Sequence, residues 1–223
     1  MLLFLMLGLA QAVSAQPPRM QREIVHVAGD VYRANNGNWW AIFMVTPDGI
    51  VLGDPLNPPF ATWLKGELDA RFGVPVRYVV YSHSHWDHAE GGEVFADTAT
   101  FVAHENMLRN MDGRYPQMPG DMVDRNNNGL IDPEDIAIPT NAKPGICGMF
   151  DGFHAQVDVN DDGVVTPAEL QRNIVPPDIV YSDRMQIELG GKRVELIHPG
   201  LNHSNDATVM LFPGERGLFA TEF

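Results

Sequence analysis

The feature that most constrains this chain is the run His-Ser-His-Trp-Asp-His at residues 83–88. It holds three of the 8 histidines in the 223-residue sequence, together with the carboxylate of Asp87. Residues 76–81 are β-branched and aromatic, which predicts a buried strand, so the run lies on the loop that follows it. His83 and His85 alternate and can point the same way. Imidazoles and a carboxylate suit zinc and related divalent ions, which favours a metal site over an incidental polar loop.

Four features of the sequence resemble the metallo-β-lactamase superfamily of metallohydrolases. Residues 83–88 match the HxHxDH signature of that family. Asp54 follows an apolar run and resembles the strand-end aspartate that precedes the signature. His203 resembles the next metal-binding histidine, and Glu222 resembles the acid that bridges two metals. The resemblance covers roughly residues 23–110 and 178–223.

The resemblance implies an α/β fold, namely a four-layer αβ/βα sandwich with the metals at the edge between two sheets. It also implies one or two zinc ions, each held by three side chains. These are His83, His85 and His203 for one ion, and Asp87, His88 and Glu222 for the other.

The resemblance further implies a zinc-dependent hydrolase that acts on a small-molecule carbonyl substrate. A metal-bound hydroxide would attack the carbonyl carbon, because a metal lowers the pKa of bound water from 15.7 toward about 7. Asp87 would be the catalytic side chain that orients the hydroxide and passes a proton to the leaving group. A lactam, lactone, ester or thioester remains open as substrate, since the motif does not select among them.

Two positions depart from the family pattern. The bridging acid is usually aspartate, and Glu222 is one methylene longer. The family also has a further strand-helix segment and a last histidine ligand after this acid, whereas this sequence stops at Phe223. We therefore expect the sequence to be a fragment with an incomplete second half of the domain, because a chain that ended on a core strand would leave a sheet uncovered.

Two further segments fit the EF-hand calcium loop, and they begin 34 residues apart, at Asp124 and Asp158. Each has oxygen-bearing side chains at positions 1, 3, 5, 9 and 12, glycine at position 6, and a backbone carbonyl ligand at position 7. The first loop ends in Asp135 instead of glutamate, which is the weaker ligand. The predicted ligands are Asp124, Asn126, Asn128, Leu130, Asp132 and Asp135 for calcium 1, and Asp158, Asn160, Asp162, Val164, Thr166 and Glu169 for calcium 2.

The charge distribution supports the calcium hypothesis. Residues 112–170 contain 11 acidic and 3 basic residues, so this segment carries −8 of the net charge of −14. Carboxylates packed this densely repel one another unless a cation is bound. The sequence has no basic patch that would meet phosphates, which argues against a nucleic-acid partner.

The N-terminus resembles an export signal. Residues 1–10 form a short apolar run, and Val13-Ser14-Ala15 provides a small-residue cleavage site. The run is shorter than the about 20 apolar residues of a membrane span, so we expect a periplasmic or secreted protein. With Cys147 as the single cysteine, no disulfide within the chain is possible.

The expected organisation is a signal peptide, two parts of one domain, and an insertion between them. The boundaries are 1–15 for the signal, 16–111 and 177–223 for the domain, and 112–176 for the EF-hand-like insertion. Periodicity and turn residues predict a helix over 61–72 and a short helix over 104–111. The expected strands are 23–33, 39–45, 49–53, 76–81, 99–103, 179–189, 193–198, 207–212 and 217–221.

A few other residues need an interpretation. His104 is expected to be an exposed capping residue rather than a part of the site, and the resemblance leaves His198 outside the metal ligands. Trp86 lies inside the metal loop and is a candidate for an apolar substrate wall. Trp39 and Trp40 are candidates for the same wall, but they are rather expected to be core, or partly core, residues on a strand.

A second hypothesis comes from a different class of protein. The chain could be a calcium-binding interaction or sensing protein whose hydrolase site is degenerate. Extracellular calcium modules bind at about 10⁻⁴ to 10⁻³ M, so such sites could serve structure rather than signalling. Zinc content and hydrolysis of a panel of carbonyl substrates would discriminate between the two hypotheses.

Overall fold

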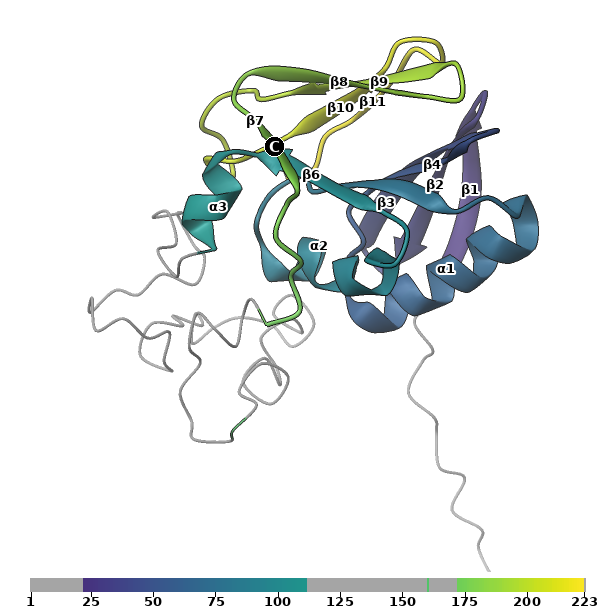
Figure 1. Cartoon of the computed structure of the whole chain (residues 1–223), viewed down its shortest axis with the longest axis horizontal. Helices are drawn as coiled ribbons and strands as arrows, with labels where there is room; N and C mark the ends of the chain where they lie inside the picture. The colour runs from purple at the N-terminus through teal and green to yellow at the C-terminus, as the bar shows by residue number, and fades with distance from the viewer. Residues whose placement is uncertain (1–21, 112–159, 161–171, 223) are drawn as a thin grey trace, which may run out of the picture.

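The computed structural model describes residues 22–111, 160 and 172–222, which form two β-sheets packed face to face (Figure 1). The larger sheet has seven strands in sequence order, antiparallel from β1 to β4 and parallel from β4 to β7. Its strands are β1 (Arg22–Ala28), β2 (Val31–Asn36), β3 (Trp39–Thr46), β4 (Gly49–Gly53), β5 (Val76–Val80), β6 (Thr100–His104) and β7 (Ile179–Tyr181).

The smaller sheet is antiparallel, with the strand order β11-β10-β9-β8. Its strands are β8 (Arg184–Leu189), β9 (Lys192–Ile197), β10 (Val209–Phe212) and β11 (Gly217–Phe219). The described helices are α1 (Pro58–Phe72), α2 (Trp86–Ala89), the 3-10 helix η1 (Glu90–Phe95) and α3 (Asn106–Asn110). Helix α1 covers the face of the larger sheet that points away from the smaller one (Figure 1).

Alternate residues of the central strands face two different cores, as the period of two in a strand requires. Phe43 and Leu52 point toward α1 and pack with Leu64 of that helix. Met44 and Val51 point the other way, toward the smaller sheet. Both faces of β4 are therefore buried, and this explains its uninterrupted apolar sequence.

Local signals at both ends define helix α1. The Asn57 side chain accepts a hydrogen bond from Phe60 N at 3.1 Å, and Pro58 and Pro59 occupy the first helical positions. Gly73 ends the helix with φ 66°. The helix thus begins three residues before the predicted start at residue 61, because prolines at these positions are compatible with a helix.

Two predicted strands are each two strands, so those predictions were wrong. Residues 23–33 form the β1–β2 hairpin, which turns where Gly29 adopts φ 54°. Residues 179–189 are interrupted at 182–183, and their two parts belong to different sheets. In both cases a short polar turn interrupts a stretch whose composition favours strand throughout.

Within the described residues, the layers run helices, larger sheet, smaller sheet. Ile174 and Val175, which the sequence assigns to the end of the insertion, pack against the helix-facing core. Tyr81 reaches the same segment, because its hydroxyl donates to the Val175 carbonyl at 3.0 Å. In this part of the chain, no helix has the length and apolar character that crossing a bilayer requires.

Candidate metal centre

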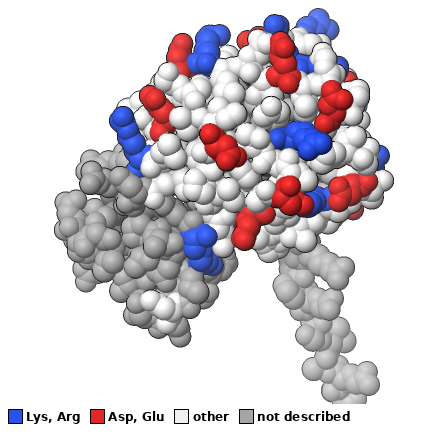
Figure 2. All heavy atoms as spheres, in the orientation of Figure 1, with Lys and Arg blue, Asp and Glu red and all other residues white. Residues whose placement is uncertain are grey.

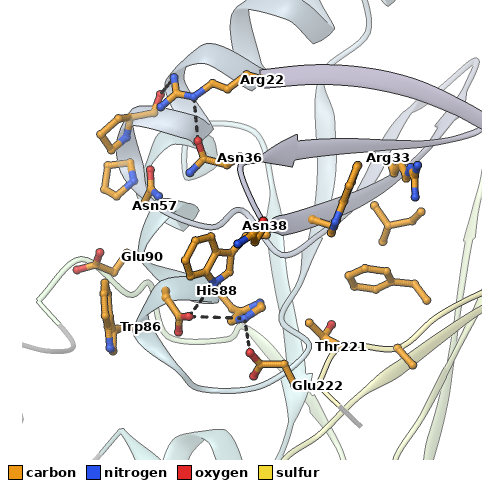
Figure 3. A pocket seen from close by; sticks show the side chains of 18 of the residues that line it. Arg22, Arg33, Asn36, Asn38, Asn57, Trp86, His88, Glu90, Thr221 and Glu222 are labelled. Carbon is orange, nitrogen blue, oxygen red and sulfur yellow. Dashed lines mark hydrogen bonds and ion pairs between the residues drawn. The ribbon is translucent and has the colours of Figure 1, made fainter. Parts of the chain in front are cut away.

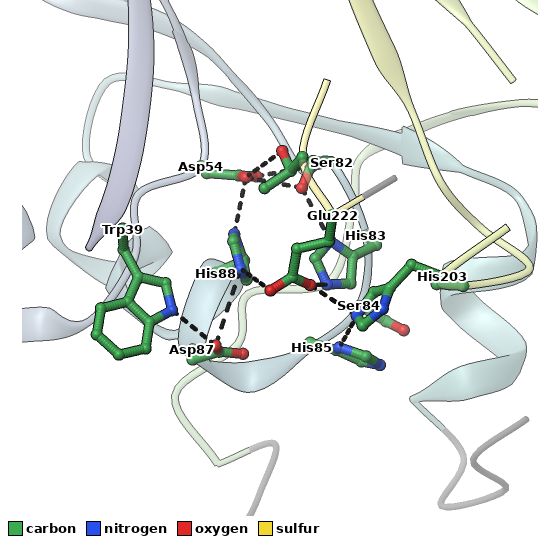
Figure 4. Close-up of polar contacts among 12 residues, drawn as sticks. Trp39, Asp54, Ser82, His83, Ser84, His85, Asp87, His88, His203 and Glu222 are labelled. Atoms are coloured by element: carbon green, nitrogen blue, oxygen red, sulfur yellow. Dashed lines mark hydrogen bonds and ion pairs between the residues drawn. The ribbon is translucent and has the colours of Figure 1, made fainter. Parts of the chain in front are cut away.

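The candidate site lies where parallel strands β4 and β5 end at the same edge of the larger sheet. Asp54 follows β4 directly, and His83 follows β5 after Tyr81 and Ser82. The chain then enters α2, which carries Asp87 and His88. The smaller sheet contributes His203 from the loop before β10 and Glu222 from the segment after β11 (Figure 4).

The structure brings the six predicted zinc ligands together in two overlapping groups. Within each group, one ligand atom per residue lies within 4.8 Å of the others. Glu222 belongs to both groups, as the resemblance to a bridging acid implies. The groups are His83, His85, His203 and Glu222, and Asp87, His88 and Glu222.

The Glu222 carboxylate makes the contacts that join the two groups. Its Oε2 lies 2.6 Å from His203 Nε2 and 3.4 Å from His83 Nε2. Its Oε1 lies 3.6 Å from His88 Nε2. The added methylene of glutamate thus does not prevent this carboxylate from reaching both sets of histidines.

The donor set fits a divalent metal. His83 Nε2 and His88 Nε2 are buried and make no hydrogen bond, which is costly for a polar atom unless another partner is bound. Imidazole nitrogens and carboxylate oxygens in groups of three and four match the ligand types of zinc. His83, His85, His203 and Glu222 would hold one ion, and Asp87, His88 and Glu222 the other.

Asp54 orients two of these histidines. Its carboxylate accepts hydrogen bonds from Ser82 N at 2.8 Å and from the Ser82 hydroxyl at 2.7 Å. That hydroxyl in turn accepts from His83 Nδ1 at 2.9 Å, and His88 Nδ1 donates to Asp54 at 3.0 Å. In the neutral rings, a proton on each Nδ1 leaves the lone pair of each Nε2 facing the site.

The backbone conformation of Asp54 helps to direct its carboxylate toward the histidines. The residue adopts φ 55°, a left-handed conformation that a non-glycine residue rarely takes. Its amide donates to the Val80 carbonyl at 3.1 Å, which ties the strained position to β5. The strain is thus held by the sheet at the point where the carboxylate must turn toward the histidines.

Trp39 makes a contact with the site that the sequence did not predict. It is partly buried on β3, in agreement with the expectation of a core or partly core residue, and its indole Nε1 donates to Asp87 Oδ2 at 3.0 Å. The contact joins residues 48 positions apart. Nothing in the local sequence around either residue signals it.

The packing of the imidazoles shifts their ionisation. Burial, together with the neighbouring His83 and His203, lowers the pKa of His85 to about 2. For Glu222, burial acts to raise the pKa, but the neighbouring imidazoles of His203, His83 and His88 outweigh it and hold the pKa well below its usual range. A neutral His85 and an ionised Glu222 are the forms that bind a metal.

His104 differs from its prediction as an exposed cap. It is buried, its Nε2 lies 2.8 Å from the Ser182 carbonyl, and its ring stacks on His198 with centroids 3.9 Å apart. Its Nδ1 does accept from Asn106 N at the start of α3. The expected exposure was wrong because the covering ring comes from another sheet. His198 lies outside both ligand groups.

The predicted calcium loops fall almost wholly outside the described residues. Of residues 124–135 and 158–169, the structure describes only Asn160, which is exposed. Cys147 also lies outside the described part of the chain. The calcium assignment therefore stays a prediction from sequence.

A pocket of about 1540 Å³ opens beside the metal centre (Figure 3). Asp87, His88 and Glu222 form part of its wall. Residues of strands β1 to β3 and of the segment from Leu218 to Glu222 line it as well. Trp39, Trp40 and Trp86 all line it, and these are three of the four tryptophans in the chain.

Comparison with known protein families gives one clear match. The model of the metallo-beta-lactamase superfamily matches residues 33–222. Among curated proteins, no sequence matches the chain significantly.

Several solved structures share the fold. FEZ-1 metallo-beta-lactamase from Legionella gormanii has 18% identity and a TM-score of 0.55, over 88% of this chain and 60% of its own. A metallo-beta-lactamase from Pontibacter korlensis has 17% identity and a TM-score of 0.56, over 90% and 71%. BJP-1, a subclass B3 enzyme of Bradyrhizobium japonicum, has 19% identity and a TM-score of 0.55, over 89% and 61%. These likenesses confirm the predicted fold class, and the chain spans less than two thirds of FEZ-1 and BJP-1.

Proposed function

The chain belongs to the metallo-β-lactamase superfamily, whose members are metal-dependent hydrolases, and we propose that it is a zinc-dependent hydrolase of small carbonyl substrates. The observation that carries the proposal is the pair of ligand groups that share Glu222 beside an open pocket. The lactam, lactone, ester and thioester classes all remain candidates, because the metal ligands would face only the reacting carbonyl, which all four share.

Asp87 and Asp54 would have different roles in such a reaction. When bound, zinc supplies Lewis acidity and lowers the pKa of a bound water to about 7. Asp87 has one carboxylate oxygen engaged by Trp39, which leaves the other oxygen to orient water and to carry a proton to the leaving group. Asp54 keeps His88 in the tautomer that presents Nε2 to the site.

Purified protein tests this proposal directly. Zinc content by mass spectrometry and hydrolysis of a lactam, a lactone, an ester and a thioester should be measured before and after chelation. We expect activity on at least one class, lost on chelation and restored by zinc. A protein that binds zinc but hydrolyses nothing in the panel would favour the alternative of a degenerate site.

We also propose that the chain binds calcium through residues 124–135 and 158–169, on the strength of the sequence pattern and its acidic charge. Calorimetry should detect binding below several millimolar, and Glu169→Gln should weaken it more than Asp135→Asn, because a glutamate at position 12 binds in bidentate fashion. Absence of binding would leave these segments as solvated acidic turns. The apolar run at residues 1–10 supports a periplasmic or secreted location, which fractionation would test.

A further inference from the structure

Three arginines line the pocket beside the metal centre, and one of them makes no hydrogen bond within residues 22–111 and 172–222. Arg22, Arg33 and Arg172 all line it. Arg22 donates to Asn36 Oδ1 at 3.0 Å and to the Pro59 carbonyl at 2.9 Å. Arg172 has interactions of its own and lies close enough to affect the ionisation of Glu90.

Arg33 differs from these two. Its guanidinium lies over the Trp40 ring, 4.1 Å from the ring centroid, and among the described residues it makes no hydrogen bond or ion pair. The side chain is exposed on β2. Val31 is on the same strand two residues away and packs toward the smaller sheet, so Arg33 projects from that same face. In Figure 3, Arg33 lies on the far side of the pocket from Trp86.

Stacking on an indole prepares a guanidinium to bind an anion. The ring covers one face of the planar group and restricts its rotation, whereas the N–H groups around its edge stay free to donate. A carboxylate or phosphate matches this fork with two parallel hydrogen bonds. Less side-chain entropy is then lost on binding than for an unsupported arginine.

The charges around Arg33 favour the same ligand. The acids that line the pocket are Asp87 and Glu222, which belong to the metal groups, and Glu90, which lies near Arg172. On the molecular face drawn in Figure 2, the described acidic and basic side chains are interspersed and form no continuous basic patch. Arg33 itself is exposed, in a chain whose net charge is −14.

We propose that Arg33, stacked on Trp40, is the anion-binding subsite for the substrate, and that the substrate carries a carboxylate or phosphate separated from the scissile carbonyl by an apolar spacer. This inference rests on the proposed hydrolase function. The spacer follows from the lining of the same pocket, where Ile42, Leu218 and Phe219 present apolar surface. The Arg33 subsite would thus select substrates by the anionic group at the end far from the scissile bond.

Two matched esters test the selectivity. The p-nitrophenyl monoester of suberic acid ends in a carboxylate, and p-nitrophenyl octanoate has the same chain length without the charge; an ω-phosphate ester distinguishes the two anions. Arg33→Gln should lower kcat/KM for the charged esters about tenfold, mainly through KM, and change the neutral ester less than twofold. Arg33→Lys should fall between, because ammonium keeps the charge but loses the fork.

Arg184→Gln is the control, because Arg184 is an exposed arginine on β8 of the smaller sheet and lies outside the pocket. Equal losses on charged and neutral esters in Arg33→Gln would overturn the subsite. If the wild type hydrolyses neither ester, titration with suberate and with phenyl phosphate, followed by tryptophan fluorescence, still decides the matter. Weaker binding in Arg33→Gln would support the subsite while the hydrolase proposal fails for these esters, and unchanged binding would overturn it.

Discussion

The two halves of the metal centre are supported in different ways. Asp87 and His88 each hydrogen-bond to a side chain of the larger sheet, Trp39 and Asp54 respectively. His85 and His203 lie 3.2 Å apart and contact each other. His83 is held from outside the ligand groups as well, through Ser82. His203 and Glu222, which the smaller sheet contributes, instead contact other ligands, and each other at 2.6 Å.

Burial follows the same division. The side chains of His83 and His88 are 3% and 2% exposed, whereas those of His203 and Glu222, which come from the smaller sheet, are 28% and 37% exposed. The larger sheet therefore provides a prearranged platform, and the residues from the smaller sheet complete it. Hydrogen-bonded supports around metal ligands commonly change affinity or activity by 10- to 100-fold, so the two halves should respond differently to mutation.

The largest loss of zinc and activity should come from removing two ligands of the same group, His83 and His85, together. His83→Ala with His85→Ala should abolish zinc binding in the first group and hydrolysis with it, because two of its three imidazoles are lost. The fold should persist, since both residues lie on a loop after β5. Metal analysis by mass spectrometry and circular dichroism measure the two outcomes.

His198→Ala is the matched control for that double variant, because His198 is near in sequence to His203 but lies outside both ligand groups. Its zinc content should equal that of the wild type. If the double variant also keeps its full zinc content, the ligand assignment is wrong.

The next largest effect tests the platform through Asp54. Asp54→Ala leaves Ser82 N and His88 Nδ1 buried without their acceptor, and breaking such a network costs about 3–5 kcal/mol of unfolding free energy. Metal affinity should fall about 10- to 100-fold through the lost orientation. Urea unfolding and competition with a zinc chelator measure these separately.

Ser82→Ala sharpens the same test. It removes the hydroxyl between Asp54 and His83 but keeps the contact from Asp54 to His88. Its cost should be about 1–3 kcal/mol, below that of Asp54→Ala. Equal costs for the two variants would contradict the view that Asp54 orients both histidines.

The proximity of the platform residues could be predicted from sequence because they are nearly contiguous. His83, His85, Asp87 and His88 span six positions after one recognisable strand, so their proximity required no knowledge of the tertiary fold. The structure brings them together beside the strand end as expected. His203 and Glu222 are far away in sequence, and only the resemblance to a known family placed them nearby.

The remaining parts of the site depend on which strands lie side by side. Trp39 reaches Asp87 only because β3 lies beside β4, which itself ends next to the motif. Arg33 meets Trp40 because β2 and β3 pair in a register that sets Asn35 opposite Trp40. A sequence pattern gives the face of a strand, but not its neighbours, so neither contact could be predicted.

A smaller effect should follow from Trp39→Phe. The ring is retained, so packing changes little, but Asp87 loses one hydrogen bond from the indole. We expect kcat to fall a few-fold, with zinc content unchanged, because Asp87 then has more freedom to rotate. Trp63→Phe is the control, since Trp63 packs on Phe60 of helix α1 and does not line the pocket. An unchanged kcat would show that this support is dispensable.

The smallest expected effect is on the pH dependence of stability, through His104 and the His198 ring of the smaller sheet. His104 stacks on His198, and His198 Nδ1 bonds the Ala207 carbonyl beyond the loop that carries His203. Burial lowers the pKa of His104 and His198 lowers it further, against the opposing effects of the Ser182 carbonyl and of Asp206 and Glu105. The folded state therefore disfavours protonated His104.

This shift has a definite sign. The unfolded chain binds the proton near pH 6.5 and the folded chain only at lower pH, so the stability contributed by neutral His104 is present above pH 6.5 and is lost as the pH falls below it. Urea unfolding at pH 7.5 and 5.5 should give a smaller loss of stability in His104→Gln than in the wild type, by less than about 1.4 kcal/mol per pH unit, the limit for one proton. If His104→Gln keeps the wild-type difference, His104 does not contribute to the pH dependence of stability.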